Sequence, residues 1–228
     1  MKSTPTGVAL AVLLAALLLP ATGAPQEGGF LEIEFIGNAA FRITDGHTTL
    51  LTDYPYTSGA FGYMSYDAAD IGVIVNGVSL ITHEHADHWN AGLFERMDLR
   101  VIAHPAITRG LDATAVVAWS PTIELADNLV IHPIATDHTA AHSSYRVEWD
   151  GVSMYFTGDT EDPTALLAQR DLDLAFVTPW LLETIATAGA TIDADRIIVH
   201  HHASGEDRPG TRAGELPAQG ATFRVVAR

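Results

Sequence analysis

The sequence contains no cysteine among its 228 residues. This absence excludes disulfide bonds, thiolate metal ligands and a cysteine nucleophile. It also excludes a lipid anchor on an N-terminal cysteine. Any metal site in this chain must therefore be built from imidazole and carboxylate groups.

Basic residues are scarce: 12 Lys and Arg stand against 28 Asp and Glu, which gives a formal net charge of −16. The basic residues are scattered along the chain rather than clustered. Nucleic acids and anionic membrane surfaces attract proteins through clustered Lys and Arg. We therefore expect neither nucleic acid nor a membrane surface as a partner of the mature protein.

Long apolar runs are also few, and only Val8–Leu19 approaches the length of a membrane span. Lys2 precedes this run, and Pro20 and small residues follow it, which is the order typical of a secretory signal peptide. An uncleaved anchor is the alternative, but the run is shorter than the roughly 20 residues that a spanning helix needs. We predict a signal peptide over residues 1–23 and an exported domain, periplasmic or extracellular, over residues 24–228.

Strand-like runs fill most of the remaining chain, from LEIEF near the start to ATFRVVA at the end. Asp-Gly pairs in ITDGHTT and EWDGVS stand between such runs and predict two β-hairpins. Helical candidates are fewer and lie at 89–97, after the capping residue Asp162, and at 181–188. Hairpins in the first half and alternating strands and helices in the second predict two sheets packed face to face with helices outside.

Eight of the eleven histidines fall in three short clusters, at 83–88, 138–142 and 200–202. In ITHEHADH an apolar strand runs directly into the first cluster. His83 and His85 point to the same side of an extended chain and can converge on one ion, while the residue between them points away. Asp87 and His88 follow where the chain turns toward a helix, and they can reach a second ion beside the first.

Three more strand ends supply further candidates. His138 ends a strand and is the preferred ligand in ATDHTAAHSSY, whereas the role of His142 is open among an outer position, a substrate contact and a turn residue. Asp159 follows a strand in TGDT and is free to bridge two ions, because another aspartate already caps the next helix. Of His200–His202 only one is needed, and since alternate strand residues face opposite ways, His201 is the predicted ligand.

These motifs, in this order, resemble the metallo-β-lactamase superfamily: HxHxDH in THEHADH, a later strand-end histidine, TGDT, and a final strand-end histidine. The opening IEFIGNAAFRITDGHTTLLTDYPY is similar to the branch containing ascorbate-phosphate lactonase-like proteins. The segment ATDHTAAHSSY resembles the third-ligand region of glyoxalase II. The resemblance covers about residues 31–204, and it implies an α/β fold of the four-layered αββα sandwich type.

The resemblance further implies two divalent metal ions, with zinc favoured and manganese or iron as alternatives. The implied ligands are His83, His85 and His138 on the first ion, Asp87, His88 and His201 on the second, and Asp159 between them. Asp87 is also the predicted catalytic residue. Asp53 matches a position that orients ligands from outside the metal site. Trp180, Tyr145 and Tyr54 are candidates either for a substrate pocket or for ordinary packing.

Two ions held a few ångströms apart can lower the pKa of a shared water to about 7, so that a metal-bridged hydroxide attacks without a Ser or Cys nucleophile. We therefore expect a hydrolase whose partner is a small molecule: an ester, lactone, thioester or phosphodiester. The alternatives are a β-lactam hydrolase, a mononuclear-iron redox enzyme and a non-enzymatic metal-binding module. Asp159 disfavours the first, because zinc β-lactamases that cleave antibiotics commonly carry Cys or Ser there. No feature indicates an oligomeric state.

Overall fold

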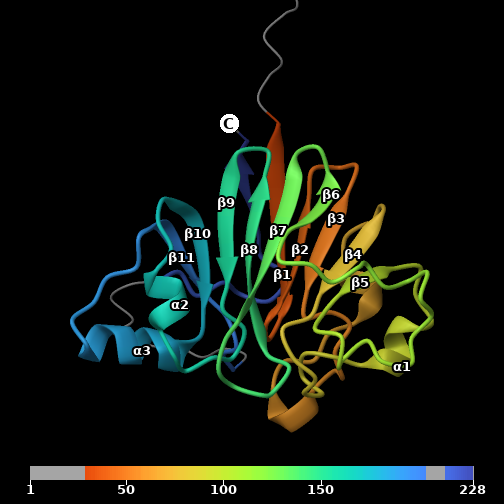
Figure 1. The fold of residues 1–228 in the computed structure, drawn as a ribbon, viewed down its shortest axis with the longest axis horizontal. Coiled ribbons are helices and arrows are strands. Elements are labelled where there is room, and N and C mark those ends of the chain that lie inside the picture. Colours follow the sequence, from red (N-terminus) through yellow and green to blue (C-terminus); the bar gives the residue numbers. More distant parts are fainter. Residues whose placement is uncertain (1–28, 204–213, 228) are drawn as a thin grey trace, which may run out of the picture.

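Two six-stranded sheets form the centre of the protein in a computed structural model that describes residues 29–203 and 214–227 (Figure 1). In spatial order, the first sheet contains β12 (Thr222–Val226), β1 (Phe30–Gly37), β2 (Ala40–Thr44), β3 (Thr49–Thr52), β4 (Gly77–Leu80) and β5 (Arg100–Ile102). The second contains β11 (Ala194–Val199), β10 (Leu172–Val177), β9 (Val152–Phe156), β8 (Ser143–Trp149), β7 (Leu129–Ala135) and β6 (Ile123–Ala126). The predicted signal peptide lies outside the described residues.

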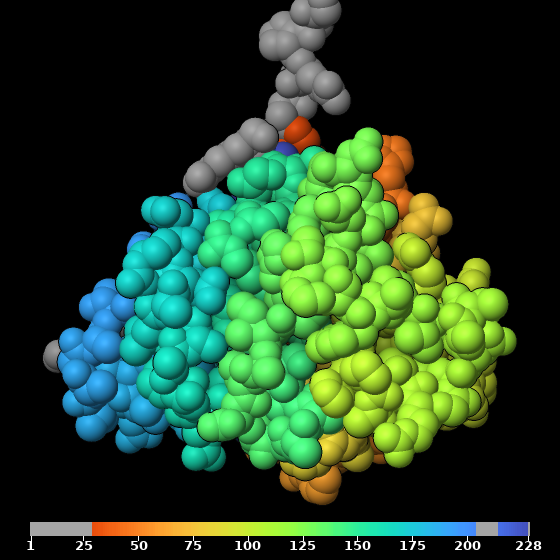
Figure 2. All heavy atoms as spheres, viewed as in Figure 1, coloured from red at the N-terminus to blue at the C-terminus, as the bar shows by residue number. Residues whose placement is uncertain are grey.

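Helices cover the outer faces of both sheets. Figure 1 shows α1 (Ala91–Phe94) beside the first sheet, and α2 (Thr164–Leu167) and α3 (Pro179–Thr187) beside the second. Figure 2 shows the corresponding yellow-green and blue segments on opposite flanks of the molecule. Two short 3-10 turns, Ala60–Gly62 and Ala68–Asp70, lie between β3 and β4. The predicted four-layered αββα sandwich is confirmed.

Strand β10 is apolar without interruption from Leu174 to Val177, and its packing explains this pattern. Leu174 and Phe176 belong to the core between the two sheets, whereas Ala175 and Val177 pack in the cluster that includes the apolar side of α3. Successive side chains of a strand point to opposite faces, and both faces of this sheet are covered. A continuous hydrophobic run therefore satisfies both layers.

Both predicted hairpins are present, since β2 pairs antiparallel with β3 and β8 with β9. Asp150 and Gly151 have φ angles of 50° and 76°, the left-handed pair that a two-residue type I′ turn requires. The predicted helix at 89–97 is only one turn, Ala91–Phe94, because it begins after Asn90, whose side chain accepts a hydrogen bond from the Leu93 N–H. Strand β6 was not predicted as a separate strand. In the structure only one of its four residues is buried.

The strands run so that many of their carboxyl ends meet at one edge of the sandwich, the lower edge in Figure 1. Strands β3, β4 and β5 are parallel, as are β9, β10 and β11. Polar residues that follow these strands are therefore gathered at one place, as in other open α/β sheets. Among the described residues, no helix has the length and apolar character that a membrane crossing requires.

Phe176→Ala is expected to lower the free energy of unfolding by about 3–5 kcal/mol. The Phe176 ring is fully buried, lies 4.3 Å from Phe156 in its own sheet and 4.7 Å from Phe41 in the other, measured between ring centroids. Truncation leaves a cavity between the sheets. Denaturant unfolding of the metal-free protein measures the loss, with the exposed Val226→Ala as control. Equal unfolding midpoints for the two variants would contradict the assignment of Phe176 to the core.

Candidate metal centre

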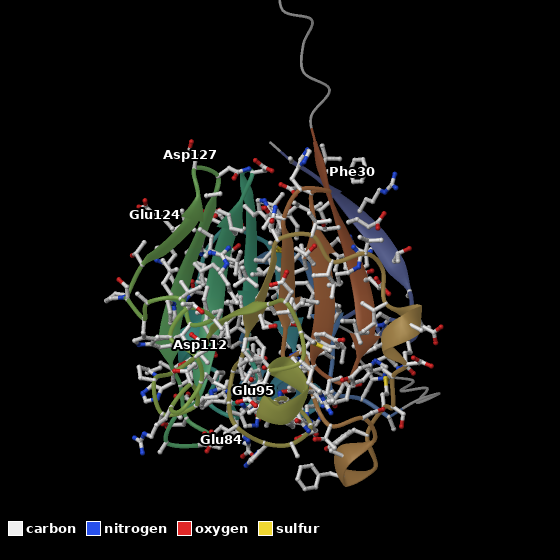
Figure 3. The ribbon with its side chains drawn as sticks, turned by 90° about the vertical axis from the view of Figure 1, so that its right-hand side faces the viewer. Phe30, Glu84, Glu95, Asp112, Glu124 and Asp127 are labelled. Atoms are coloured by element: carbon white, nitrogen blue, oxygen red, sulfur yellow. The ribbon has the colours of Figure 1, made fainter. Side chains whose placement is uncertain are left out.

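The first donor group consists of His83, His85 and His138, whose ring nitrogens lie within 4.8 Å of one another. His83 Nε2 is 3.0 Å from His85 Nδ1, and His138 Nε2 is 3.4 Å from the same His85 atom. His83 is fully buried, while the other two rings are exposed. Glu84 belongs to neither donor group: its exposed side chain lies at the lower end of the molecule in Figure 3 and accepts a hydrogen bond from Thr139 Oγ1 at 3.0 Å.

The second donor group consists of Asp87, His88, Asp159 and His201, all buried. His201 Nε2 lies 3.1 Å from Asp87 Oδ2, 3.1 Å from Asp159 Oδ2 and 3.2 Å from His88 Nε2. His88 Nε2 lies 3.2 Å from Asp159 Oδ2 and 3.6 Å from Asp87 Oδ2. Ligands about 2.0–2.2 Å from a tetrahedral ion are separated by about 3.3–3.6 Å, so these four atoms form a cage of suitable size.

Unused hydrogen-bonding capacity also fits a cation in this cage. Asp87 Oδ1, Asp159 Oδ1 and His201 Nδ1 are buried without a hydrogen-bond partner in the described part of the chain. Within the same residues, neither carboxylate forms an ion pair with Lys or Arg. Buried carboxylates are costly unless they are paired or bind a metal, and imidazole with carboxylate is a ligand set for zinc, manganese or iron.

Without a metal, the second donor group forms a coupled set of charges. Burial lowers the pKa of His88, but the carboxylates of Asp159 and Asp53 outweigh it and hold that pKa well above its usual value. Burial raises the pKa of Asp159, yet His88 and His201 outweigh it and hold the pKa well below its usual value. The pKa of Asp87 is lowered in the same way, because the effect of burial is outweighed chiefly by His201. Without a metal, positive charge on the histidines thus balances the two carboxylates, and a divalent ion bound in the cage can supply that positive charge instead.

His83 and His138 of the first donor group are held in the neutral form of imidazole, which is the form that binds metals. Burial, reinforced by the neighbouring His88, lowers the pKa of His83 far below its usual value. Burial also lowers the pKa of His138, although Asp159 opposes the effect. The two donor groups therefore differ in character: the first contains only imidazoles, and the second contains two carboxylates and two imidazoles.

Asp53 supports both donor groups from β3. Its Oδ2 atom accepts a hydrogen bond from His88 Nδ1 at 2.9 Å, and its carboxylate also accepts from the N–H and the hydroxyl of Thr82. The Thr82 hydroxyl is in turn 3.1 Å from His83 Nδ1. These bonds leave Nε2 of both histidines directed at the donor groups, which fits the orienting role that the resemblance implies for Asp53.

His142 lies behind Asp159 and not in either donor group. Its Nε2 atom accepts a hydrogen bond from the Asp159 N–H at 3.1 Å, and its Nδ1 atom donates to Thr136 Oγ1 at 2.8 Å. Burial, with a smaller effect of His138, lowers the pKa of His142 to about 4. Gly158 permits this contact, since a Cβ atom there would come within 2.6 Å of His142 Nε2. Of the three roles open from the sequence, the geometry favours the outer position, in which His142 holds the Asp159 backbone.

His142→Ala is expected to lower the affinity for the second metal ion by about tenfold, because the Asp159 N–H loses its buried acceptor and the carboxylate its fixed position. Zinc titration against a chromogenic chelator measures this loss. Thr136→Val removes only the hydrogen bond between Thr136 and His142 Nδ1 and leaves the bond from the Asp159 N–H to His142 in place. It is therefore expected to have a smaller effect on zinc affinity. An unchanged zinc affinity in His142→Ala would contradict the orienting role.

The structure sorts the remaining candidates. Of the three consecutive histidines only His201 enters a donor group; His200 approaches Thr157, and the ring of His202 stacks on Phe35. Tyr54 and Tyr145 are buried in the core, which is the packing alternative. The Trp180 ring stands edge-on to His201, with its centroid 5.0 Å away.

Two neighbours of the second donor group were not predicted. Tyr63 meets His201 edge-on at 4.2 Å, and the Asn38 side chain donates a hydrogen bond to the Asp87 carbonyl at 2.7 Å. Tyr63 lies in a loop that carries no motif. Asn38 lies in the opening segment that resembles the lactonase-like branch, but no role was predicted for it.

Two face-to-face sheets with outer helices, and paired His/Asp groups at one sheet edge, define the class of metallo-β-lactamase-fold proteins. The family described as beta-lactamase superfamily domain matches residues 32–179, and the chain belongs to this superfamily. A UPF0173 metal-dependent hydrolase of Rhizobium leguminosarum bv. trifolii is 29% identical over 158 residues, which cover 63% of this chain and 64% of the relative. The aligned region therefore spans less than two thirds of that relative.

Solved structures show the same fold at lower sequence identity. A metallo hydrolase of the archaeon Ignicoccus hospitalis has a TM-score of 0.62 at 14% identity, covering 86% of this chain and 98% of that one. The metallo-beta-lactamase fold protein YhfI of Bacillus subtilis has a TM-score of 0.60 at 13% identity, covering 86% and 100%. These likenesses support the fold, and the site residues of this chain rest on its own geometry.

Proposed function

We propose that this chain is an exported hydrolase that uses two divalent ions to cleave a small neutral or cationic ester, lactone or thioester. The observation that carries this proposal is that two donor groups of different character lie side by side. The ring centroids of His83 in the first and His88 in the second are only 4.0 Å apart. Two such neighbouring cages favour a dinuclear centre over a single redox iron or a structural ion.

In this proposal the first donor group holds one ion and the second holds the other. Asp159 is the shared ligand, because its Oδ2 atom belongs to the second group while its buried Oδ1 atom has no partner among the described residues. Zinc is favoured because it accepts both imidazole and carboxylate, with manganese or iron as alternatives. A pair of divalent ions supplies hydroxide at neutral pH and polarises the bond to be cleaved.

The surroundings of His138 narrow the substrate class. A cavity of about 490 Å³ is lined by this histidine and by three acidic residues, Asp137, Glu161 and Asp162. No Lys or Arg of the described residues lines it. The acidic lining of this cavity repels a negatively charged substrate, at a cost of about 1 kcal/mol per close charge in water and more in a partly buried site. Phosphodiesters are therefore disfavoured relative to uncharged or cationic carbonyl compounds.

Export rests on the N-terminal pattern, in which a basic residue, an apolar run and small residues precede the domain. Expression of the full chain in a Gram-negative host, followed by cell fractionation and mass spectrometry, tests it. Recovery of a periplasmic protein that begins near residue 24 is the expected result. A cytoplasmic protein of full length would exclude export.

Metal analysis combined with a substrate panel tests the enzymatic part. We expect two ions per chain, and faster turnover of a neutral aryl ester, lactone or thioester than of bis(4-nitrophenyl) phosphate. A chromogenic cephalosporin cleaved in preference to all of these would favour a β-lactam hydrolase. Stoichiometric metal without turnover of any substrate would favour a non-enzymatic metal-binding module. One iron ion per chain would favour a mononuclear-iron redox enzyme.

Glu161→Lys is expected to raise kcat/KM for an anionic aryl ester about thirtyfold relative to its neutral analogue, because a repulsion of about 1 kcal/mol becomes an attraction of similar size. Competition between the two esters at low ionic strength measures the ratio, and added salt should reduce the change. Glu183→Lys, on the exposed side of α3, makes the same charge change outside the cavity lining. An equal shift in both variants would show that net charge, and not the acidic lining of the cavity, controls the preference.

A further inference from the structure

Asn38 lies in the turn between β1 and β2, where its side chain is completely buried. Its amide nitrogen Nδ2 donates to the Asp87 carbonyl at 2.7 Å and lies 3.4 Å from Asp87 Oδ2. Its own carbonyl accepts a hydrogen bond from the His201 N–H at 2.7 Å. One residue therefore contacts two members of the second donor group, which come from the ends of β4 in the first sheet and β11 in the second.

A role in the turn alone does not account for these contacts. Asn38 has a φ of 56°, a left-handed conformation that asparagine tolerates better than most residues. Asn76 has a similar φ of 47°, but it is exposed and its amide bonds only to the His47 carbonyl in a hairpin. The buried amide of Asn38 instead donates to the Asp87 backbone at 2.7 Å, and it lies 3.4 Å from the Asp87 carboxylate oxygen that meets His201.

We propose that Asn38 is a positioning residue that sets the affinity of the second donor group for its metal ion. This inference rests on the two-ion part of the proposed function. The main-chain bond holds the His201 segment, and the side-chain amide holds both the Asp87 backbone and the carboxylate. An N–H donor beside Asp87 Oδ2 also leaves that oxygen a lone pair for the cage, as outer partners of metal-binding carboxylates do.

The first donor group has no corresponding contact with Asn38. The hydrogen bonds around its three histidines run to one another, to Thr82 and, through Thr82, to Asp53. Loss of the Asn38 amide should therefore lower the affinity for the ion in the second donor group and leave the affinity for the ion in the first group unchanged. A residue that only supported the fold would affect both ions together.

Zinc binding by two variants of the full chain tests the proposal. Asn38→Gly keeps the left-handed backbone and its bond to His201 but removes the amide. Asn38→Asp keeps the shape and replaces the donor by a carboxylate that repels Asp87. Each is made in the natural sequence and in the His83→Ala/His138→Ala background, in which only the second donor group remains. Zinc dissociation constants come from competition with a chromogenic chelator, and Asn76→Gly is the matched control.

We expect both Asn38 variants to weaken zinc binding about 10–100-fold in the His83→Ala/His138→Ala background. In the natural sequence one stepwise dissociation constant should rise by the same factor while the other changes less than about threefold. Equal weakening of both constants, or no weakening beyond that of Asn76→Gly, would overturn the proposal. If the natural sequence itself fails to bind two ions, the proposed function fails instead, so the two failures are distinguishable.

Discussion

Replacement of both His83 and His138 by alanine is expected to remove the metal ion of the first donor group and to lower turnover at least about a thousandfold. The two residues supply two of the three nitrogens in that group. A single remaining histidine, His85, is exposed and has no second imidazole beside it. Without an ion in this position, the shared water would lose one of the two cations that lower its pKa, and less hydroxide would be available at neutral pH.

Metal content by mass spectrometry and kcat for the best substrate of the panel measure this prediction. His47→Ala/His132→Ala is the matched control, because it also removes two imidazoles and neither belongs to a donor group. The control should keep two ions per chain and full turnover. Should the His83→Ala/His138→Ala protein retain both ions, the assignment of the first donor group is wrong.

Asp159→Asn is expected to lower the affinity for the second metal ion at least about a hundredfold and to reduce turnover by a similar factor. Asparagine has the same shape, so the packing around the buried side chain is retained. The negative charge is lost, however, and with it an anionic ligand that lies 3.2 Å from His88 Nε2 and 3.1 Å from His201 Nε2. If Asp159 is shared between the ions, the affinity for the first ion should fall as well.

Zinc titration separates these outcomes. Loss of a ligand shared by both ions raises both zinc dissociation constants, whereas loss of a ligand to the second ion alone raises only the second constant. Asp193→Asn, an exposed aspartate outside both donor groups, is the control for loss of one negative charge. Full turnover in Asp159→Asn would contradict the dinuclear mechanism. If Asp159→Asn weakens the binding of the second ion alone, Asp159 is a ligand of the second donor group but does not bridge the two ions.

Chain-local features of this protein were predictable because neighbouring residues determine them. Absence of cysteine restricted the metal ligands to imidazole and carboxylate. The spacing of two residues between His83 and His85, in the segment after β4, allowed both rings to reach one donor group. The Asp-Gly pairs set the two hairpins: Asp150 and Gly151 both have left-handed φ angles, and in the other hairpin Gly46 has one. The predicted α/β sandwich followed from the same alternation of apolar residues.

Only the tertiary structure decided how the separate segments combine. It placed Asp159 with Asp87, His88 and His201, put His142 behind Asp159, and brought Asn38 against Asp87. The separations in the chain range from 17 residues, between His142 and Asp159, to 114 residues, between Asp87 and His201. These residues meet because strands of two sheets end at one edge. Periodicity in a sequence tells which face of a strand is buried, but the residues opposite that face depend on strand order and packing.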